Sequence, residues 1–303
     1  MEMLPLNSHL SSGVLLLVVI LLNYTGRYDG SNIAWTGRGT TANLEEIVIG
    51  RCNDYIGLKN PAAGKKNCTL LWQTLKSVFA SKDPCKITQD DYKPFLTMAE
   101  HDIPSGKSIF WSQTGELTRQ YADIVKNVMP LESTLTGYML NGLNWCGQRS
   151  SSELNYEVCP AWNECEENAA KSFWRSASVV YAKKASGEVK VVLNGSSQTR
   201  AFRTESIFGS IELGNLDTNR ISSIQLWIMD NLSGSDKESC GVGSIAQLEI
   251  ALKHKGFKFS CIDNYSIFRS GVCKEELDTW GTADLPGSDN SDYPNHCRGL
   301  IPF

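Results

Sequence analysis

Ten cysteines constrain this chain more than any other feature of its sequence. They lie at Cys52, Cys68, Cys85, Cys146, Cys159, Cys165, Cys240, Cys261, Cys273 and Cys297. The number is even, and all ten follow an apolar N-terminal run, which in an exported chain predicts five disulfides. A metal site is the competing interpretation, but the chain has no CxxC pair and none of its four histidines stands in a zinc-ligand pattern. We therefore expect no metal and a disulfide framework whose pairing spacing alone does not decide.

The N-terminal segment predicts export. Residues 13–22 read GVLLLVVILL, which is shorter than the ~20 apolar residues of a bilayer span and matches the apolar region of a signal peptide. We expect a signal peptide over residues 1–28. A short uncleaved signal-anchor stays open, because no Lys or Arg precedes the run and no clear cleavage site follows it. Either segment places the body of the protein outside the cell or on the luminal face of a membrane.

Two further features bear on the location of the protein, and the second agrees with export. Residues 289–303 contain no apolar tail, so no GPI anchor is expected at that end. Four sequons are candidate glycosylation sites: Asn67, Asn194, Asn231 and Asn264.

Composition and absent motifs exclude several functions. The formal net charge of −4 gives no basic surface for a phosphate backbone, so no nucleic-acid partner is expected. The chain has no GxGxxG dinucleotide fingerprint, no P-loop and no GxSxG nucleophile elbow. Few histidines and paired cysteines also disfavour a Cys–His nucleophile. The remaining candidates are carboxylates and aromatic side chains.

Hydrophobic patterns differ between the two halves of the chain. The N-terminal half carries apolar stripes at helical spacing, such as Trp72, Leu75 and Phe79. The C-terminal half has β-rich runs at residues 189–193, 221–229 and 257–262. Between the last two runs, Ser244 and Gln247 predict a capping box that begins a helix, and Gly256 is placed to end it. A strand, a helix and a strand at this spacing predict a parallel pair.

The expected fold class is therefore α+β or α/β. A mainly helical N-terminal lobe is predicted over residues 30–104 and 130–185. A smaller C-terminal lobe, over residues 105–129 and 186–303, is predicted to hold a short parallel sheet flanked by helices. A ligand is expected in a cleft between the lobes, near the carboxyl ends of the strands.

An ordered set of short motifs resembles the ADP-ribosyl cyclase / cyclic ADP-ribose hydrolase family, from about Leu44 to about Cys297. The motifs are Gly50–Cys52, Ile109–Trp111, Leu131–Glu132 with Gly137–Tyr138, Trp145–Cys146, Phe173–Trp174, Leu193–Ser196 and Phe208–Glu212. No single motif is decisive, but their order together with the cysteine spacing is specific.

The resemblance implies a disulfide pairing. The implied pairs are Cys52–Cys68, Cys85–Cys165, Cys146–Cys159, Cys240–Cys261 and Cys273–Cys297. Some family members carry one more bridge beside the active cleft. Here Ser105 stands where one of its cysteines would be, so we expect that bridge to be absent.

The resemblance also implies a reaction: cleavage of the bond between ribose and the nicotinamide of NAD. The leaving group is neutral, so no general acid is required, while a carboxylate stabilises the oxocarbenium-like ribosyl centre. Glu212, in a largely apolar segment, fits this role. The alternative is an outward-facing charge on a strand, which we would favour for a glutamate without the family match.

Aromatic and acidic residues complete the predicted site. Trp111 and Trp174 match tryptophans that stack on the flat bases of the substrate, although core packing is the usual role of a tryptophan. Glu132 matches a second carboxylate that influences cyclisation against hydrolysis, with a helix first-turn charge as the alternative. Many members carry an acidic residue directly after it, where this chain has Ser133.

Further residues are predicted to touch the substrate. Ser178, one helical turn after Trp174, matches a serine on the ribose or phosphate side. Phe208 and Ser112 are expected at the phosphate end, and Leu131 beside Glu132. Members often have a basic residue where this chain has Gln113, so backbone N–H groups are expected to hold the phosphates. Ile207 is expected near the reacting centre, where a bulky apolar side chain excludes water and favours cyclisation.

Three functions are weighed. The first is an ectoenzyme that makes cyclic ADP-ribose and some ADP-ribose from NAD, with base exchange on NADP to NAADP as a side activity. NAD and NADP are then substrates, and no cofactor is expected. The second is a catalytically weak NAD-binding receptor on the same scaffold. The third is a carbohydrate hydrolase with paired carboxylates, which the flat aromatic partners disfavour. A homodimer is allowed, since homodimers occur among relatives, but no motif indicates one.

Overall fold

The computed structural model describes residues 35–149, 151–230 and 237–264. The chain divides into two units, Met1–Trp35 and Thr36–Phe303, and every described helix and strand belongs to the second. The predicted signal peptide, the Asn231 sequon, the Cys273–Cys297 bridge and the C-terminal tail lie outside the described residues. None of the described helices combines the length and the apolar character needed to cross a bilayer.

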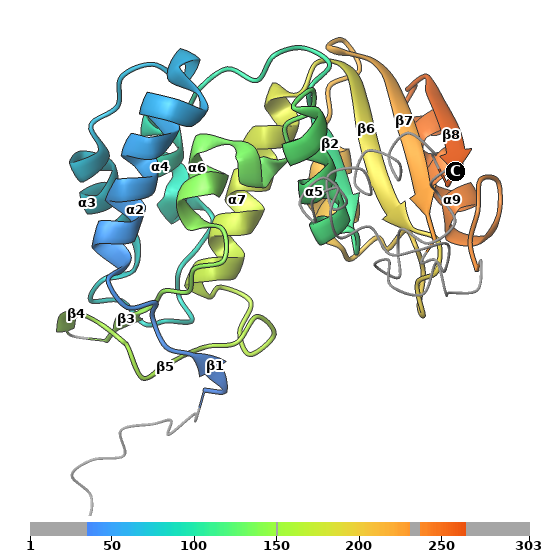
Figure 1. The fold of residues 1–303 in the computed structure, drawn as a ribbon. Helices are drawn as coiled ribbons and strands as arrows, with labels where there is room; N and C mark the ends of the chain where they lie inside the picture. The colour runs from blue at the N-terminus through green and yellow to red at the C-terminus, as the bar shows by residue number, and fades with distance from the viewer. Residues whose placement is uncertain (1–34, 150, 231–236, 265–303) are drawn as a thin grey trace, which may run out of the picture. The chain divides into compact units, whose positions relative to one another are not determined.

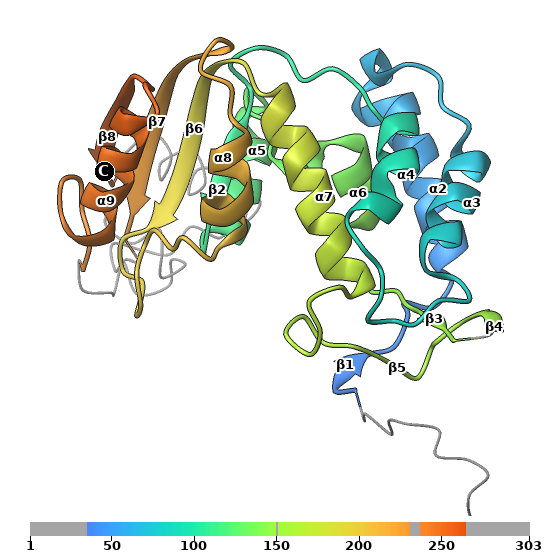
Figure 2. The same cartoon turned by 180° about the vertical axis from the view of Figure 1, so that it is seen from behind.

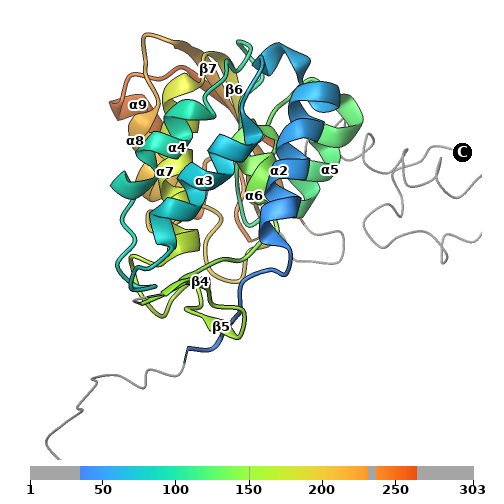
Figure 3. The same cartoon turned by 90° about the vertical axis from the view of Figure 1, so that its left-hand side faces the viewer.

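One side of the second unit is helical. Its helices are α2 (Leu44–Asp54), α3 (Cys68–Phe79), α4 (Lys93–Met98), α6 (Leu135–Leu140) and α7 (Ala169–Lys184). Figure 1 shows them grouped together, with α7 beside the sheet, and Figure 3 looks onto their outer side, where α3 lies in front. Short turns connect them: π-helical Tyr55–Lys59 and 3-10 turns at Pro61–Ala63, Asp90–Tyr92 and Leu131–Ser133.

Side-chain caps set where several of these helices begin. The Asn67 carboxamide accepts a hydrogen bond from Leu70 N at 3.0 Å at the start of α3. The Asn168 carboxamide does the same for Lys171 N at 2.9 Å at the start of α7. Each cap satisfies a backbone donor that has no partner inside the helix. The predicted stripe on α3 is buried in the core, as its spacing indicates.

The other side is a parallel sheet in the order β2-β6-β7-β8. Its strands are β2 (Ile109–Ser112), β6 (Gly187–Asn194), β7 (Ile221–Met229) and β8 (Phe259–Asp263). All three pairings are parallel. The three predicted strands and the strand–helix–strand arrangement are therefore confirmed, and so is the mixed α/β fold class. Two short antiparallel pairs lie elsewhere: β1 (Gly37–Arg38) with β5 (Val158–Cys159), and β3 (Gly147–Gln148) with β4 (Ser151–Leu154).

Successive residues of the central strands face opposite helices, as strand geometry requires. Val192 and Trp227 pack in one cluster with α5 (Gly115–Val125), while Val191 and Leu226 join the main core with α9 (Gly243–His254). Figures 1 and 2 show α5 on one face of the sheet, and α9 with the short α8 (Leu213–Asn215) on the other. Because both faces are covered, consecutive apolar residues are buried in the two central strands, at residues 191–193 of β6 and 226–229 of β7.

The predicted capping box was wrong. Helix α9 begins at Gly243, and its N-cap residue Val242 makes no side-chain cap. The buried Ser244 hydroxyl instead accepts from Phe202 N at 2.9 Å and donates to the Glu238 carboxylate. The hydroxyl thus ties a neighbouring loop to the helix. Sequence spacing does not show such a competing long-range partner.

Disulfides hold both sides of the unit. The structure contains Cys52–Cys68, Cys85–Cys165, Cys146–Cys159 and Cys240–Cys261, which confirms four of the implied pairs. No described cysteine is free. The first bridge joins α2 to α3, and its 16-residue loop stabilises the fold by about 3 kcal/mol in the chain-entropy model. Four disulfides indicate that the chain folds in an oxidising compartment. The predicted bounds of the two lobes stay a prediction.

Candidate active site

A cavity of about 580 Å³ lies at the carboxyl end of β2. Its lining comes from β2, α7, the 3-10 turn Leu131–Ser133 and the segment that ends at Glu212. The nine residues predicted from the sequence as catalytic or substrate-binding all line it: Glu212, Glu132, Trp111, Trp174, Ser178, Phe208, Ile207, Ser112 and Leu131. The structure therefore brings the predicted residues together in one place of a size suited to a nucleotide.

Glu212 lies in a π-helical turn, Phe208–Glu212, that runs directly into α8. It is helical, so the alternative of an outward-facing charge on a strand does not apply. The side chain is 6% exposed, and its Oε1 accepts a hydrogen bond from Ser178 Oγ at 2.9 Å. A π-turn carries one extra residue within a helix, and such turns are frequent at functional sites.

Burial controls the charge of Glu212. Loss of water disfavours the carboxylate and raises the pKa of Glu212 to about 8. The hydrogen bond from Ser178 favours the ionised form and offsets part of this effect, whereas the nearby Glu132 adds to it. The residue is thus poised to gain or lose a proton near neutral pH, which is typical of functional carboxyl groups.

Glu132 is bound to Trp111. The indole Nε1 donates to Glu132 Oε1 at 3.1 Å and to Oε2 at 3.3 Å. Burial raises the pKa of Glu132, while the Trp111 hydrogen bond and the Arg119 charge act in the opposite direction. Glu132 stands in a 3-10 turn before α6 and points into the cavity, so it is not a solvated helix charge.

Two glycines make this pairing sterically possible. A Cβ on Gly137 would lie 2.0 Å from the Leu131 carbonyl oxygen and 2.7 Å from Glu132 Cα, so α6 packs directly against the turn that carries Glu132. A Cβ on Gly115 would lie 2.8 Å from the Trp111 ring. The backbone therefore approaches the turn and the indole more closely than any other residue type would allow.

Helix α7 supplies one wall of the cavity. Trp174, Ser178 and Tyr181 follow one another at spacings of four and three residues, so they lie on one face of the helix. Trp174 is half-buried and packs its ring against Phe173, with centroids 5.0 Å apart and an interplanar angle of 68°. Ser178 is buried, and its hydroxyl is used by Glu212.

Tyr181 is a residue that the sequence analysis missed. Its hydroxyl donates to the Met129 carbonyl at 2.6 Å and accepts from Ile109 N at 2.9 Å. Burial raises its pKa well above the ordinary value, so the phenol stays neutral and holds β2 against α7. Its position seven residues after Trp174, on the same face of a helix, could have indicated that it belongs to the site.

The cavity also contains two arginines that were not predicted. Arg119 forms an ion pair with Glu116 on its own helix. The Nε atom of Arg203 is buried and has no hydrogen-bond partner among the described residues. Gln113, which replaces a common basic residue, is used elsewhere: its carboxamide donates to Arg200 O at 2.9 Å and accepts from Ser197 Oγ at 2.9 Å.

Two predicted residues have mixed environments. Phe208 is 1% exposed and packs against Phe110 and Phe202, so most of its side chain belongs to the core. Ile207 is half-buried and lines the cavity directly before the π-turn.

Within the described part of the chain, one group of metal-ligand residue types lies close together, and it includes Cys240 and Cys261. These two cysteines form a disulfide, so they offer no thiolate to a metal.

Comparisons with known proteins show which family this chain resembles. A family model described as ADP-ribosyl cyclase matches residues 41–280. Human ADP-ribosyl cyclase/cyclic ADP-ribose hydrolase 2 is 41% identical over 236 residues, which cover 78% of this chain and 74% of that protein. The Aplysia californica ADP-ribosyl cyclase/cyclic ADP-ribose hydrolase is 38% identical over 228 residues, 74% of this chain and 80% of that protein.

Solved structures are similar as well. Porcine CD38 with a covalent intermediate, ribo-F-ribose-5'-phosphate, matches with a TM-score of 0.73 and 35% identity, over 76% of this chain and 99% of that one. Aplysia cyclase with the substrate NGD and the product cGDPR also matches with a TM-score of 0.73 and 35% identity, over 79% and 96% of the two chains.

The raised pKa of Glu212 generates a stability prediction. The carboxyl has an ordinary value of 4.5 and a folded value of about 8, so between these pH values the folded state binds more protons than the unfolded state. Stability contributed by this group is therefore lost as pH rises through the window, with a slope of at most about 1.4 kcal/mol per pH unit. Glu212→Gln removes the titration, so the variant should gain stability relative to the wild type from pH 5 to pH 8.

Urea unfolding of the oxidised proteins at both pH values measures this difference. Glu205→Gln is the matched control, because Glu205 lines the same cavity but is exposed. Equal changes with pH in the wild type and in Glu212→Gln would contradict the assignment.

Proposed function

Because the chain belongs to the ADP-ribosyl cyclase family, we propose that it is an ectoenzyme that cleaves the nicotinamide–ribose bond of NAD. The main product is cyclic ADP-ribose, accompanied by some ADP-ribose. The observation that carries the proposal is a buried carboxyl, Glu212, held by Ser178 inside a cavity that Trp111 and Trp174 also line. The matched family and relatives are named as enzymes, which favours turnover over the receptor alternative.

The reaction breaks one bond at ribose C1 and forms another at the same carbon. The bond from ribose C1 to the pyridinium nitrogen breaks, and its electron pair leaves with nicotinamide, which becomes neutral. The positive charge moves to the ribosyl centre, where an ionised Glu212 stabilises it. Adenine N1 then bonds to C1 and closes the ring of cyclic ADP-ribose. Alternatively, water bonds to C1, which gives ADP-ribose and releases a proton. Because no leaving group has to be protonated, the step needs neither a general acid nor a metal.

The surroundings of Glu212 suit this role. A carboxylate in a site with little water interacts with a developing cation more strongly than it would in bulk solvent. The Ser178 hydroxyl orients Oε1 and leaves Oε2 available to the ribose. The positively charged nicotinamide of the substrate favours the ionised form, so binding of NAD supplies part of the free energy needed to deprotonate Glu212.

The other lining residues bind and orient the dinucleotide. The aromatic faces of Trp111 and Trp174 suit a planar cation and the adenine. Glu132, fixed by the Trp111 indole, acts on the choice between cyclisation and hydrolysis. The diphosphate requires donors, and the Arg203 side chain in the cavity lining offers a guanidinium in place of the basic residue replaced by Gln113.

Several finer points stay predictions. NADP is expected as a second substrate whose nicotinamide exchanges with another pyridine to give NAADP. Export by the N-terminal segment follows from the sequence arguments, and the resemblance allows a homodimer.

The central experiment compares the wild type with Glu212→Gln. The oxidised chain is incubated with NAD, and the nucleotides are separated by chromatography. We expect cyclic ADP-ribose to dominate, and the variant to lose turnover by about 10²–10³-fold while it still binds NAD. Glu46→Gln is the control, because Glu46 is exposed on α2 and lies outside the lining of the candidate active site, and it should keep wild-type turnover. A folded wild-type protein that releases no nicotinamide would favour the receptor alternative.

The pKa of Glu212 predicts a pH profile. The free enzyme needs the ionised carboxylate, so kcat/KM should rise with pH, reach half of its maximum near pH 8 and level off above that value. The acid limb of kcat should lie at lower pH, because the bound pyridinium cation favours ionisation. Initial rates of nicotinamide release between pH 5 and pH 9 measure both limbs. Identical acid limbs in kcat and kcat/KM would argue against direct contact between the cation and the carboxylate.

Ile207 is predicted to bear on the product. A hydroxyl in place of part of this apolar side chain admits water near the reacting centre. Ile207→Thr should therefore raise the share of ADP-ribose relative to cyclic ADP-ribose, with little change in the rate of nicotinamide release. Chromatography of the products measures the share, and an unchanged ratio would reject the idea.

A further inference from the structure

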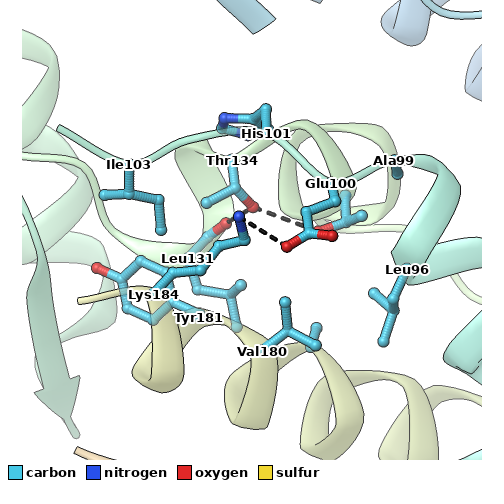
Figure 4. A pocket seen from close by; sticks show the side chains of 12 residues that line it. Leu96, Ala99, Glu100, His101, Ile103, Leu131, Thr134, Val180, Tyr181 and Lys184 are labelled. Carbon is cyan, nitrogen blue, oxygen red and sulfur yellow. Dashed lines mark hydrogen bonds and ion pairs between the residues drawn. The ribbon is translucent and has the colours of Figure 1, made fainter. Parts of the chain in front are cut away.

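A second, much smaller cavity lies behind the turn that carries Glu132. Its volume is about 30 Å³, which is room for a single water rather than a ligand. Figure 4 shows the cavity between α7 and the residues that follow α4, with His101 and Thr134 above, Val180 below, and the Lys184–Glu100 ion pair between them. Leu131 lines both this cavity and the candidate active site, so the two share a wall.

We propose that His101 is a positioning residue for Glu132: its imidazole holds the turn from Leu131 to Leu135 from behind and thereby sets where the Glu132 carboxylate stands. The inference rests on the proposed function, because it assigns His101 a part in the choice of product.

Hydrogen bonds connect His101 and Tyr55 to the turn. Leu135 N donates to His101 Nε2 at 3.0 Å, and His101 Nδ1 donates to its neighbour's carbonyl, Asp102 O, at 2.9 Å. This arrangement requires a neutral ring with its proton on Nδ1. The Tyr55 hydroxyl lies 3.3 Å from the same Nε2 and donates to the Ser133 carbonyl at 3.0 Å. Two successive parts of the turn are therefore held from behind by a pair of side chains in contact.

The turn is held from the front as well. Trp111 Nε1 binds the Glu132 carboxylate at 3.1 Å, and Gly137 packs without a side chain against Leu131 and Glu132. Thr134 Oγ1 donates to Leu131 O at 2.7 Å and closes the turn internally. Contacts on both sides leave the turn from Leu131 to Leu135 little room to shift. Loss of the His101 contact allows the turn to move, and the Glu132 carboxylate moves with it.

The surroundings of His101 keep the ring neutral. Burial lowers the pKa of His101, and the positive charges of Lys184 and Lys66 act in the same direction. The backbone bond to Asp102 and its carboxylate act in the opposite direction. Lys184 is itself paired with Glu100 at 2.8 Å and lies 4.0 Å from Asp102. An unprotonated Nε2 is therefore available to accept the Leu135 bond.

The test compares two substitutions at one position. In His101→Gln the carboxamide oxygen can replace Nε2 as acceptor, whereas His101→Leu fills the space without an acceptor. Each is made in the wild type and in Glu132→Gln, and kcat, KM and the ratio of cyclic ADP-ribose to ADP-ribose are measured with NAD. We expect His101→Leu to lower kcat about tenfold and to shift the product ratio, and His101→Gln to stay close to the wild type.

The double variant separates positioning from general damage. If His101 acts through Glu132, His101→Leu changes the product ratio no further once Glu132 is Gln. An equal shift in both backgrounds, or equal damage from Gln and Leu, would overturn the proposal. Hydrogen exchange of the peptide around Leu135 gives a readout that needs no activity, and faster exchange is expected only in His101→Leu. If the wild type cleaves no NAD, the proposed function fails, while hydrogen exchange still decides whether His101 holds the turn.

Discussion

The hydroxyl of Tyr181 is the interaction on which the cavity depends. It contacts the backbone of both Ile109 and Met129, at the start of β2 and in the segment that leads to Glu132. One buried side chain from α7 thus joins the helical side of the molecule to the edge strand of the sheet. Because the Ile109 amide and the Met129 carbonyl would otherwise lose this partner in a dry interior, the contact is costly to break. It sets the distance between the wall that carries Ser178 and the strand that carries Trp111.

Two effects oppose each other at the candidate site: burial favours neutral carboxyl groups, and the proposed role of Glu212 requires a charged one. Burial of a carboxyl destabilises the folded state, and the disulfides and the continuous apolar core offset this cost. Among the described residues, Glu212 has one side-chain hydrogen-bond partner, Ser178, and Glu132 accepts its hydrogen bonds from the Trp111 indole. A carboxylate paired with a cation would be more stable in its ionised form but would gain less from a cationic ligand. The small number of compensating partners agrees with the role proposed for Glu212.

Part of this arrangement could be predicted from the sequence and part could not. Strands such as 221–229 could be predicted because β-branched and aromatic residues are enriched in strands. The nine site residues were chosen through the family resemblance, and the structure gathers them, while their roles stay proposals. The π-turn at Glu212 and the contact between His101 and Leu135 depend on long-range packing, which no local pattern contains. The capping box failed for the same reason, since Ser244 had a better partner far away in the chain.

The π-helical turn has a consequence for how the site is encoded. One extra residue between Phe208 and Glu212 rotates everything beyond it by about 100° around the helix axis, compared with an ordinary α-helix. The direction of the Glu212 carboxylate therefore depends on the number of residues in this segment and not only on their identity. A deletion of one residue here would turn the acid away from the cavity even if every side chain of the site were kept. Insertions and deletions in this segment should therefore matter as well as substitutions.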